Sequence, residues 1–193
     1  MKTDIILSGV GGQGILSVAT IIGEAALAEN LYIKQAEVHG MSQRGGDVQS
    51  NLRLSDRPIN SDLIAAGSAD VIISLEPMEA LRYLPYLAQE GWIITSSTPF
   101  VNIPNYPDEN RLKAEFEKLP HVVMLDVDAL AKEHNLPKSA NVILLGAAAK
   151  ALQIIGYEDL EKSIARVFAG KGQAVVEMNI KALSIGYRAV EKI

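Results

Sequence analysis

The sequence predicts an α/β fold in which a mostly parallel sheet is flanked by helices, and three observations carry this prediction. Short apolar runs typical of buried strands alternate with segments of helical periodicity as far as residue 133. A glycine-rich turn at residues 9–14 joins the first strand to the first helix, as in Rossmann-like sheets. Beyond residue 139 the pattern is helical only, so we expect the C-terminal helices to pack on the same sheet.

The elements of the first half follow from their apolar patterns. Residues 4–10 form a nearly continuous apolar run that ends in glycines, which is typical of a strand buried on both faces. Residues 14–29 carry apolar side chains at helical spacing, and Asn30 can close this helix in the left-handed conformation. A second buried strand is expected at 32–38. The alternation of polar and apolar residues over 48–54 predicts a strand with one solvent-exposed face.

The second half is interpreted in the same way. Pro77 suits the first turn of a helix, and Asp126 and Asp128 suit the amino terminus of another. The proline- and asparagine-rich segment 97–110 predicts a long loop, a feature more typical of lids and partner contacts than of plain connectors. The other predicted strands lie at 71–75, 92–96 and 122–126, and the other predicted helices at 77–88, 111–119, 140–155, 158–168 and 173–192.

Length and composition exclude several classes of protein. Residues 1–193 are expected to form one domain, because no repeat, linker or charge block divides them. A net charge of -5 and an aromatic content of 5% do not fit a nucleic-acid-binding surface. The longest apolar stretches, such as 142–149, are far shorter than the ~20 residues of a membrane span, and the amino terminus lacks a signal-peptide pattern. We therefore expect a cytoplasmic protein that binds neither nucleic acid nor membrane.

The sequence contains no cysteine. This excludes a disulfide framework, a thiolate zinc site and any cysteine-held iron–sulfur cluster within the chain. No other metal site is expected, since His121 and His134 are isolated from acids at ligand spacing and are expected on the surface. The motifs of a P-loop and of a serine nucleophile are absent as well.

The first candidate site is the segment from Gly9 to Gly14, which matches G-x-G-x-x-G between a predicted strand and a predicted helix. Glycines there permit a tight turn and let backbone N–H groups approach a phosphate at the positive end of the helix. Glu37, near the end of the second strand, roughly takes the place of the acid that a dinucleotide site requires. The alternative is a tight crossover whose glycines serve only packing.

The second candidate site is the polar, glycine-rich stretch from Glu37 to Asp47. In open α/β sheets such a loop lies at the carboxyl edge, so we expect it to meet the first glycine loop. Arg44, followed by two glycines, suits capture of a carboxylate or phosphate, and His39 could serve as a hydrogen-bond donor or acid/base. The alternative is a turn in which Arg44 pairs with Glu37 or Asp47.

Four segments resemble the small, γ-type subunit of the 2-oxoacid:ferredoxin oxidoreductases, most strongly the β subunit of the indolepyruvate enzymes. The stretch between Glu37 and Gly46 discriminates best, and together the segments span most of the chain in the family's order. The pyruvate and 2-oxoglutarate enzymes tend to carry a Tyr-Gly-Pro-type sequence where His39-Gly40-Met41 stands here. Pyruvate and 2-oxoglutarate are therefore the alternative substrates. The matching segments are Gly9–Ile15, Ala36–Gly46, Leu75–Pro85 and Ser139–Gly146.

The resemblance implies a subunit, inactive alone, of an enzyme that oxidatively decarboxylates arylpyruvates to acyl-CoA and passes the electrons to ferredoxin. Thiamine diphosphate, Mg and the iron–sulfur clusters are then expected on a large catalytic partner, and coenzyme A is a co-substrate. The isolated chain is expected to be either a monomer or a homodimer. No residue is assigned as the covalent catalyst, and His39 and Arg44 are the candidates for a catalytic role.

The two loops would then border the thiamine or coenzyme A pocket. Backbone N–H groups of the first loop would meet an anion that Arg44 clamps, while other side chains orient it. The expected binding residues are Gly11, Gly12, Gln13, Gly14, Glu37, His39, Gln43, Arg44 and Gly45. Two rival hypotheses stay open: a stand-alone Rossmann-like nucleotide-binding protein, and a scaffold whose loops only pack on a partner.

Overall fold

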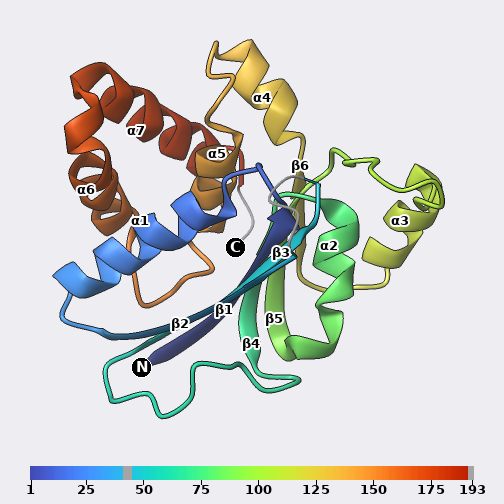
Figure 1. Cartoon of the computed structure of the whole chain (residues 1–193), viewed down its shortest axis with the longest axis horizontal. Coiled ribbons are helices and arrows are strands. Elements are labelled where there is room, and N and C mark those ends of the chain that lie inside the picture. The colour runs from blue at the N-terminus through green and yellow to red at the C-terminus, as the bar shows by residue number, and fades with distance from the viewer. Residues whose placement is uncertain (41–44, 191–193) are drawn as a thin grey trace.

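The computed structural model describes residues 1–40 and 45–190 (Figure 1). The strands are β1 (Lys2–Val10), β2 (Tyr32–His39), β3 (Asp47–Ser55), β4 (Ala69–Ser74), β5 (Leu87–Ser96) and β6 (Val122–Leu125). The α-helices are α1 (Ile15–Ala28), α2 (Pro77–Arg82), α3 (Glu109–Phe116), α4 (Val127–Glu133), α5 (Ala140–Ala148), α6 (Tyr157–Phe168) and α7 (Gln173–Arg188). Short 3-10 turns lie at Leu84–Tyr86 and Ala169–Lys171.

The strands form one sheet in the order β2-β3-β1-β4-β5-β6. The pairs β1–β4, β4–β5 and β5–β6 are parallel, whereas β3 runs antiparallel to both β1 and β2. A parallel pair needs a crossover of about a dozen residues or more, and the short connection from β2 to β3 is compatible only with the antiparallel arrangement. The predicted α/β fold with a mostly parallel sheet is therefore confirmed.

Helices cover the two faces of the sheet unequally (Figure 1). Side chains of β1 alternate between two cores: Ile5 and Leu7 pack with α1 and the C-terminal helices, and Ile6 packs with α2 and α3. Because α1 follows β1 on one face and α2 follows β4 on the other, the chain changes sides between β1 and β4. The carboxyl edge at this switch point is where open α/β sheets bind their ligands.

Of the C-terminal helices, α5 packs directly on the sheet, as predicted, whereas α7 packs mainly on α5 and α6 mainly on α1. Helices α5 and α7 approach so closely that a Cβ atom on Gly146 would lie 2.0 Å from the Leu183 carbonyl oxygen. A Cβ atom on Gly186 would lie 1.7 Å from the Ile143 carbonyl oxygen. The larger core, which contains most of α5, depends on this close crossing.

Several predicted boundaries are confirmed, whereas other boundaries and the predicted burial of one strand are wrong. Gly14 and Glu29 cap α1, and Asn30 is left-handed with φ 57°. The helix predicted at 77–88 ends at Arg82, because Pro85 interrupts the backbone hydrogen bonding and β5 already begins at Leu87. Helix α5 ends at Ala148 instead of residue 155. Strand β2, predicted to be buried, is an edge strand and mostly exposed.

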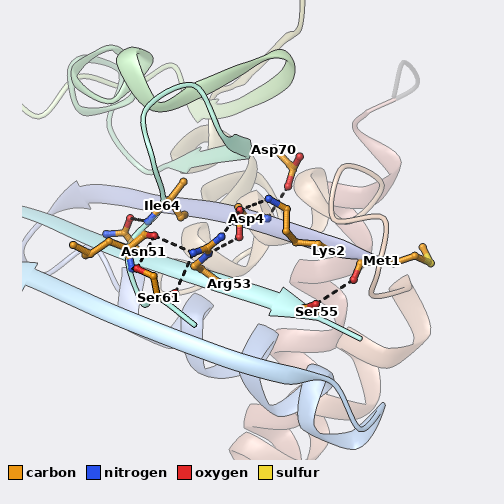
Figure 2. A network of polar contacts seen from close by, with 10 residues as sticks. Met1, Lys2, Asp4, Asn51, Arg53, Ser55, Ser61, Ile64 and Asp70 are labelled. Atoms are coloured by element: carbon orange, nitrogen blue, oxygen red, sulfur yellow. Dashed lines mark hydrogen bonds and ion pairs between the residues drawn. The ribbon is translucent and has the colours of Figure 1, made fainter. Parts of the chain in front are cut away.

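A polar network ties the amino edge of the sheet together, where the parallel strands begin (Figure 2). The carboxylate of Asp4 is fully buried and accepts hydrogen bonds from Arg53 Nε at 2.8 Å and Arg53 Nη2 at 3.0 Å. Arg53 Nη1 donates to the carbonyl oxygens of Ser61 and Leu63 at 3.0 Å, and Asn51 Oδ1 accepts from the Ile64 N–H at 3.2 Å. The network thus holds the β3–β4 connection against the sheet.

Across residues 1–40 and 45–190, no helix has the length and apolar character that a membrane crossing requires.

Candidate functional site

The glycine loop after β1 takes a shape that depends on glycine. Gly12 and Gly14 have φ values of 102° and 87°, which side-chain-bearing residues rarely adopt. A Cβ atom on Gly14 would lie 2.7 Å from Nδ2 of Asn141, which donates to the Gly14 carbonyl oxygen at 3.1 Å. The loop is therefore fixed both by its backbone and by the start of α5.

The side chain of Gln13 braces this loop. Its Oε1 accepts from the Val10 N–H at 2.7 Å, and its Nε2 donates to the Leu75 carbonyl oxygen at 3.1 Å. The amide thereby joins the ends of β1 and β4 at the switch point. Gln13 was predicted to bind a ligand, and the structure shows its amide engaged with the chain's own backbone.

The two glycine loops meet, as the sequence predicts. The Gly11 N–H donates to the Gly46 carbonyl oxygen at 2.8 Å, and the Gly45 N–H donates to the Gly11 carbonyl oxygen at 3.3 Å. These bonds occupy the N–H groups of Gly11 and Gly45. Those of Gly12 and Gly14 donate no hydrogen bond within the described part of the chain.

A pocket of about 370 Å³ opens between the glycine loop and the end of β2. Glu37 and His39 both line it from the same face of β2, because side chains two apart on a strand share a face. The imidazole Nδ1 of His39 lies 3.1 Å from the Gly40 carbonyl oxygen. The pocket walls are Val10, Gly11, Gly12, Gly14, Ile15, Leu16, Glu37, His39 and Val48.

A second, more polar pocket of about 490 Å³ lies across the glycine loop from the first. The amino termini of α1, α4 and α5 meet around it, Lys138 adds a positive charge, and Asp128 adds a negative one. Helix amino termini and the lysine favour an anion on their side of the pocket, and Asp128 opposes one on the α4 side. Lys138 and Asn141 were not predicted as site residues, although Asn141 falls within one of the segments that carry the family resemblance. A larger hollow of about 580 Å³, between α4, α6 and α7, shares no lining residue with either pocket.

Two predicted binding residues, Gln43 and Arg44, lie outside the described residues. The structure therefore brings together Gly11, Gly12, Gly14, Glu37 and His39 around one pocket, with Gly45 bonded to its wall. Within the same described ranges, no group of three or more His, Asp or Glu side chains could hold a metal ion.

A buried carboxylate lies under the carboxyl edge and was missed by sequence reasoning. Glu76 is fully buried and caps α2 by accepting from the Glu79 N–H at 2.8 Å. Its other oxygen accepts from the Phe100 N–H at 3.3 Å and from the Tyr106 hydroxyl. The sequence offered one signal, since Glu76 precedes Pro77 where an N-cap residue is expected.

Negative charge gathers beside this carboxylate. Burial raises the pKa of Glu79, hydrogen bonding to Arg82 lowers it in part, and the charges of Glu76 and Asp47 raise it further. Burial, followed by the charges of Asp47 and Glu79, raises the pKa of Tyr83 to about 12. The surroundings of the switch point thus favour neutral groups or bound cations over further anions on the α2 side.

Residues 4–189 match the family model described as pyruvate ferredoxin/flavodoxin oxidoreductase. The chain belongs to this family. It is a γ-type subunit, since relatives that are 29% to 30% identical over 87% to 97% of this chain are named common subunit gamma. The indolepyruvate oxidoreductase subunit IorB of Archaeoglobus fulgidus is 33% identical over 97% of this chain and 94% of that protein. The 2-oxoglutarate synthase subunit KorC of Methanocaldococcus jannaschii is 28% identical over 100% of this chain and 96% of its own length.

Solved structures show the same fold for this γ-type subunit. The pyruvate oxidoreductase subunit PORC of Thermotoga maritima superposes with a TM-score of 0.73 at 21% identity, covering 97% of this chain and 96% of that one. The 2-oxoglutarate:ferredoxin oxidoreductase of Magnetococcus marinus gives a TM-score of 0.76 at 20% identity. There the match covers 100% of this chain but 32% of the longer one.

Proposed function

We propose that this γ-type subunit, as one domain over residues 1–193, serves an arylpyruvate:ferredoxin oxidoreductase that acts on indolepyruvate. In the proposed reaction the carboxylate of the 2-oxoacid leaves as carbon dioxide, the remaining acyl group joins coenzyme A, and the electrons reduce ferredoxin. The supporting observation is the identity of 31% to 33% to four relatives named indolepyruvate oxidoreductase subunits. Relatives named for 2-oxoglutarate or for pyruvate and ketoisovalerate match at 28% to 30%.

The chain's own residues do not suit the redox and thiamine cofactors. It has no cysteine for a cluster, and no described group of acidic or histidine side chains for a metal. Thiamine diphosphate, Mg and the iron–sulfur clusters are therefore assigned to a large catalytic subunit, where the thiamine supplies the decarboxylation chemistry. The pocket beside the glycine loop would close against that subunit. The proposed complex works in the cytoplasm and binds neither nucleic acid nor a membrane.

In this proposal the chain binds and orients an anionic group. The N–H groups of Gly12 and Gly14 would donate to it, and Arg44 would clamp it. Glu37, His39 and Gln43 would orient the neighbouring part of the ligand, and Lys138 would attract its charged end. Coenzyme A, with its phosphates, is the ligand that this combination suits best.

The substrate assignment can be tested by coexpressing the chain with its catalytic subunit and following ferredoxin reduction with three 2-oxoacids. We expect kcat/KM for indolepyruvate to exceed that for pyruvate and for 2-oxoglutarate by at least about tenfold, because a pocket shaped for an aromatic substrate distinguishes it by burial. A preference for pyruvate or 2-oxoglutarate would overturn the indolepyruvate assignment and identify that 2-oxoacid as the substrate. Micromolar binding of NADH by the isolated chain, with no turnover in the complex, would favour the stand-alone nucleotide-binding protein.

The anion clamp can be tested in the same complex with Arg44→Ala. Loss of a charge-assisted contact should weaken ligand binding by about 1.5–3 kcal/mol, or roughly 10- to 150-fold in the KM for coenzyme A. Lys34→Ala, which removes a surface cation that pairs with Asp62 on the connection after β3, is the matched control. If Arg44→Ala assembles normally and keeps the wild-type KM for coenzyme A, the anion clamp is overturned and the loops only pack on the partner.

A further inference from the structure

The loop between β5 and α3, residues 97–108, exposes apolar side chains at its tip. Val101 is 71% exposed, Phe100 is 42% exposed and Ile103 is 38% exposed. Single exposed apolar residues are common on proteins, but three of them within four residues form a contiguous apolar surface, which is typical of an interaction site. We call Phe100, Val101 and Ile103 the apolar tip.

The apolar tip is held in place from below by Glu76. Burial of a carboxylate costs free energy unless hydrogen bonds compensate it. Two of the donors to Glu76 come from this loop, the Phe100 N–H and the Tyr106 hydroxyl. Burial and then the Glu76 carboxylate raise the pKa of Tyr106, so its hydroxyl remains a donor at neutral pH. The loop therefore has a defined conformation although its tip is exposed.

Further contacts fix the loop beside the candidate site. Asn102 Nδ2 donates to the Gly45 carbonyl oxygen at 2.5 Å, which ties the apolar tip to the second glycine loop. Near the start of the loop, Thr98 Oγ1 donates to Asp126 Oδ1 at 3.2 Å. Backbone and polar side chains are thus bound inward, and the apolar side chains remain outside.

Exposed apolar side chains gather at the carboxyl edge more generally. Of the nine large apolar residues that are strongly exposed in the described chain, five lie at this edge. One of them, Leu16, lines the pocket beside the glycine loop. The five residues are Leu16, Val38, Phe100, Val101 and Ile103.

We propose that the apolar tip is the docking surface for the large catalytic subunit, and that Glu76, Tyr106 and Asn102 position it. This inference rests on the proposed function, because a ligand held by the glycine loops can reach the partner's cofactor only if that subunit covers the carboxyl edge. The tip lies on the rim of that edge through the Asn102–Gly45 contact. The same fold makes up 32% of a longer chain in the M. marinus enzyme, where it adjoins further protein covalently.

The test compares two substitutions, each of which replaces a strongly exposed apolar residue with a charged one. Val101→Asp alters the apolar tip, and Leu63→Asp alters a residue that is 61% exposed on the β3–β4 connection at the opposite edge. Affinity of each chain for the separately purified catalytic subunit is measured by titration. We expect Val101→Asp to weaken binding by at least about tenfold, as for a central interface residue, and Leu63→Asp to leave it unchanged.

A third variant tests the positioning role. Tyr106→Phe keeps the apolar tip but removes the hydroxyl donor to Glu76, so binding should weaken severalfold while kcat of the assembled complex stays the same. Thermal unfolding of every variant is recorded, and Val101→Ser replaces Val101→Asp if the latter does not reach the wild-type midpoint.

The outcomes separate this inference from the proposed function. Wild-type affinity of Val101→Asp, or equal weakening by Leu63→Asp, overturns the docking surface while the proposed function stands. Self-association of the wild-type chain that Val101→Asp abolishes, with unchanged binding of the catalytic subunit, assigns the tip to a second copy and also overturns it. Failure of the wild-type chain to bind any thiamine-dependent subunit overturns both.

Discussion

At the amino edge of the sheet Arg53 holds Asp4, and at the carboxyl edge Arg82 holds Glu79, each arginine through two nitrogen atoms. Both carboxylates are nearly inaccessible, with side chains 0% and 4% exposed. The arginines differ, because the Arg53 side chain is 17% exposed and that of Arg82 is 50% exposed. Asp4 also has a second cation, Lys2, at 2.7 Å.

The two surroundings move the carboxyl groups in opposite directions. Burial raises the pKa of Asp4, but hydrogen bonds and charges from Arg53 and Lys2 outweigh it and hold the pKa below its usual range. Burial raises the pKa of Glu79, and one half-exposed arginine does not compensate for it. At the amino edge the charge of Asp4 is thus matched by two cations, whereas on the α2 side of the carboxyl edge the burial of Glu79 is only partly compensated.

The largest expected effect comes from removing one arginine. Arg53→Met leaves Asp4 buried without its main partner and releases the β3–β4 connection, which should cost about 3–5 kcal/mol of unfolding free energy. The matched change Arg82→Met should cost at most about 1 kcal/mol, because Arg82 is half-exposed and its attraction to Glu79 is screened by solvent. Urea unfolding at neutral pH measures both values.

A double substitution checks the cause of the larger loss. In Asp4→Asn/Arg53→Met no unpaired charge is buried, so much of the lost stability should return relative to Arg53→Met. If the double variant is as unstable as the single one, the loss comes from the packing of the β3–β4 connection and the contrast between the two edges disappears.

Local patterns predicted most of the fold. The apolar run of β1, the helical spacing of α1 and the left-handed Asn30 depend on neighbours in sequence, so the sequence alone identifies them. The exposure of β2 depends on its place at the end of the strand order, which is decided by tertiary pairing. His121, expected on the surface, has a buried Nδ1 and stacks on Trp92 with ring centroids 4.9 Å apart, again through a long-range contact.

The candidate site was predictable in its location but not in its details. The general rule for open sheets places both glycine loops at the carboxyl edge, and their hydrogen bonds confirm that they meet. The bracing role of Gln13 depends on Leu75, and the role of Glu76 depends on Tyr106. No local pattern reveals partners that lie tens of residues away, so these roles emerge only from the fold.

The smaller expected effect is a pH dependence of opposite sign at the two edges. Since the folded-state pKa of Asp4 is lowered, Asp4 contributes stability that is present above its ordinary pKa of 3.8 and is lost as pH falls through the folded value. Since that of Glu79 is raised, Glu79 contributes stability that is present below its ordinary pKa of 4.5 and is lost as pH rises through the folded value. Urea unfolding free energies should therefore fall less steeply on acidification in Asp4→Asn, and less steeply on raising the pH toward neutrality in Glu79→Gln. Each variant serves as the control for the other. Flattening of the high-pH side in both would show that burial dominates at both edges, and flattening of the acid side in both would show that ion pairing does.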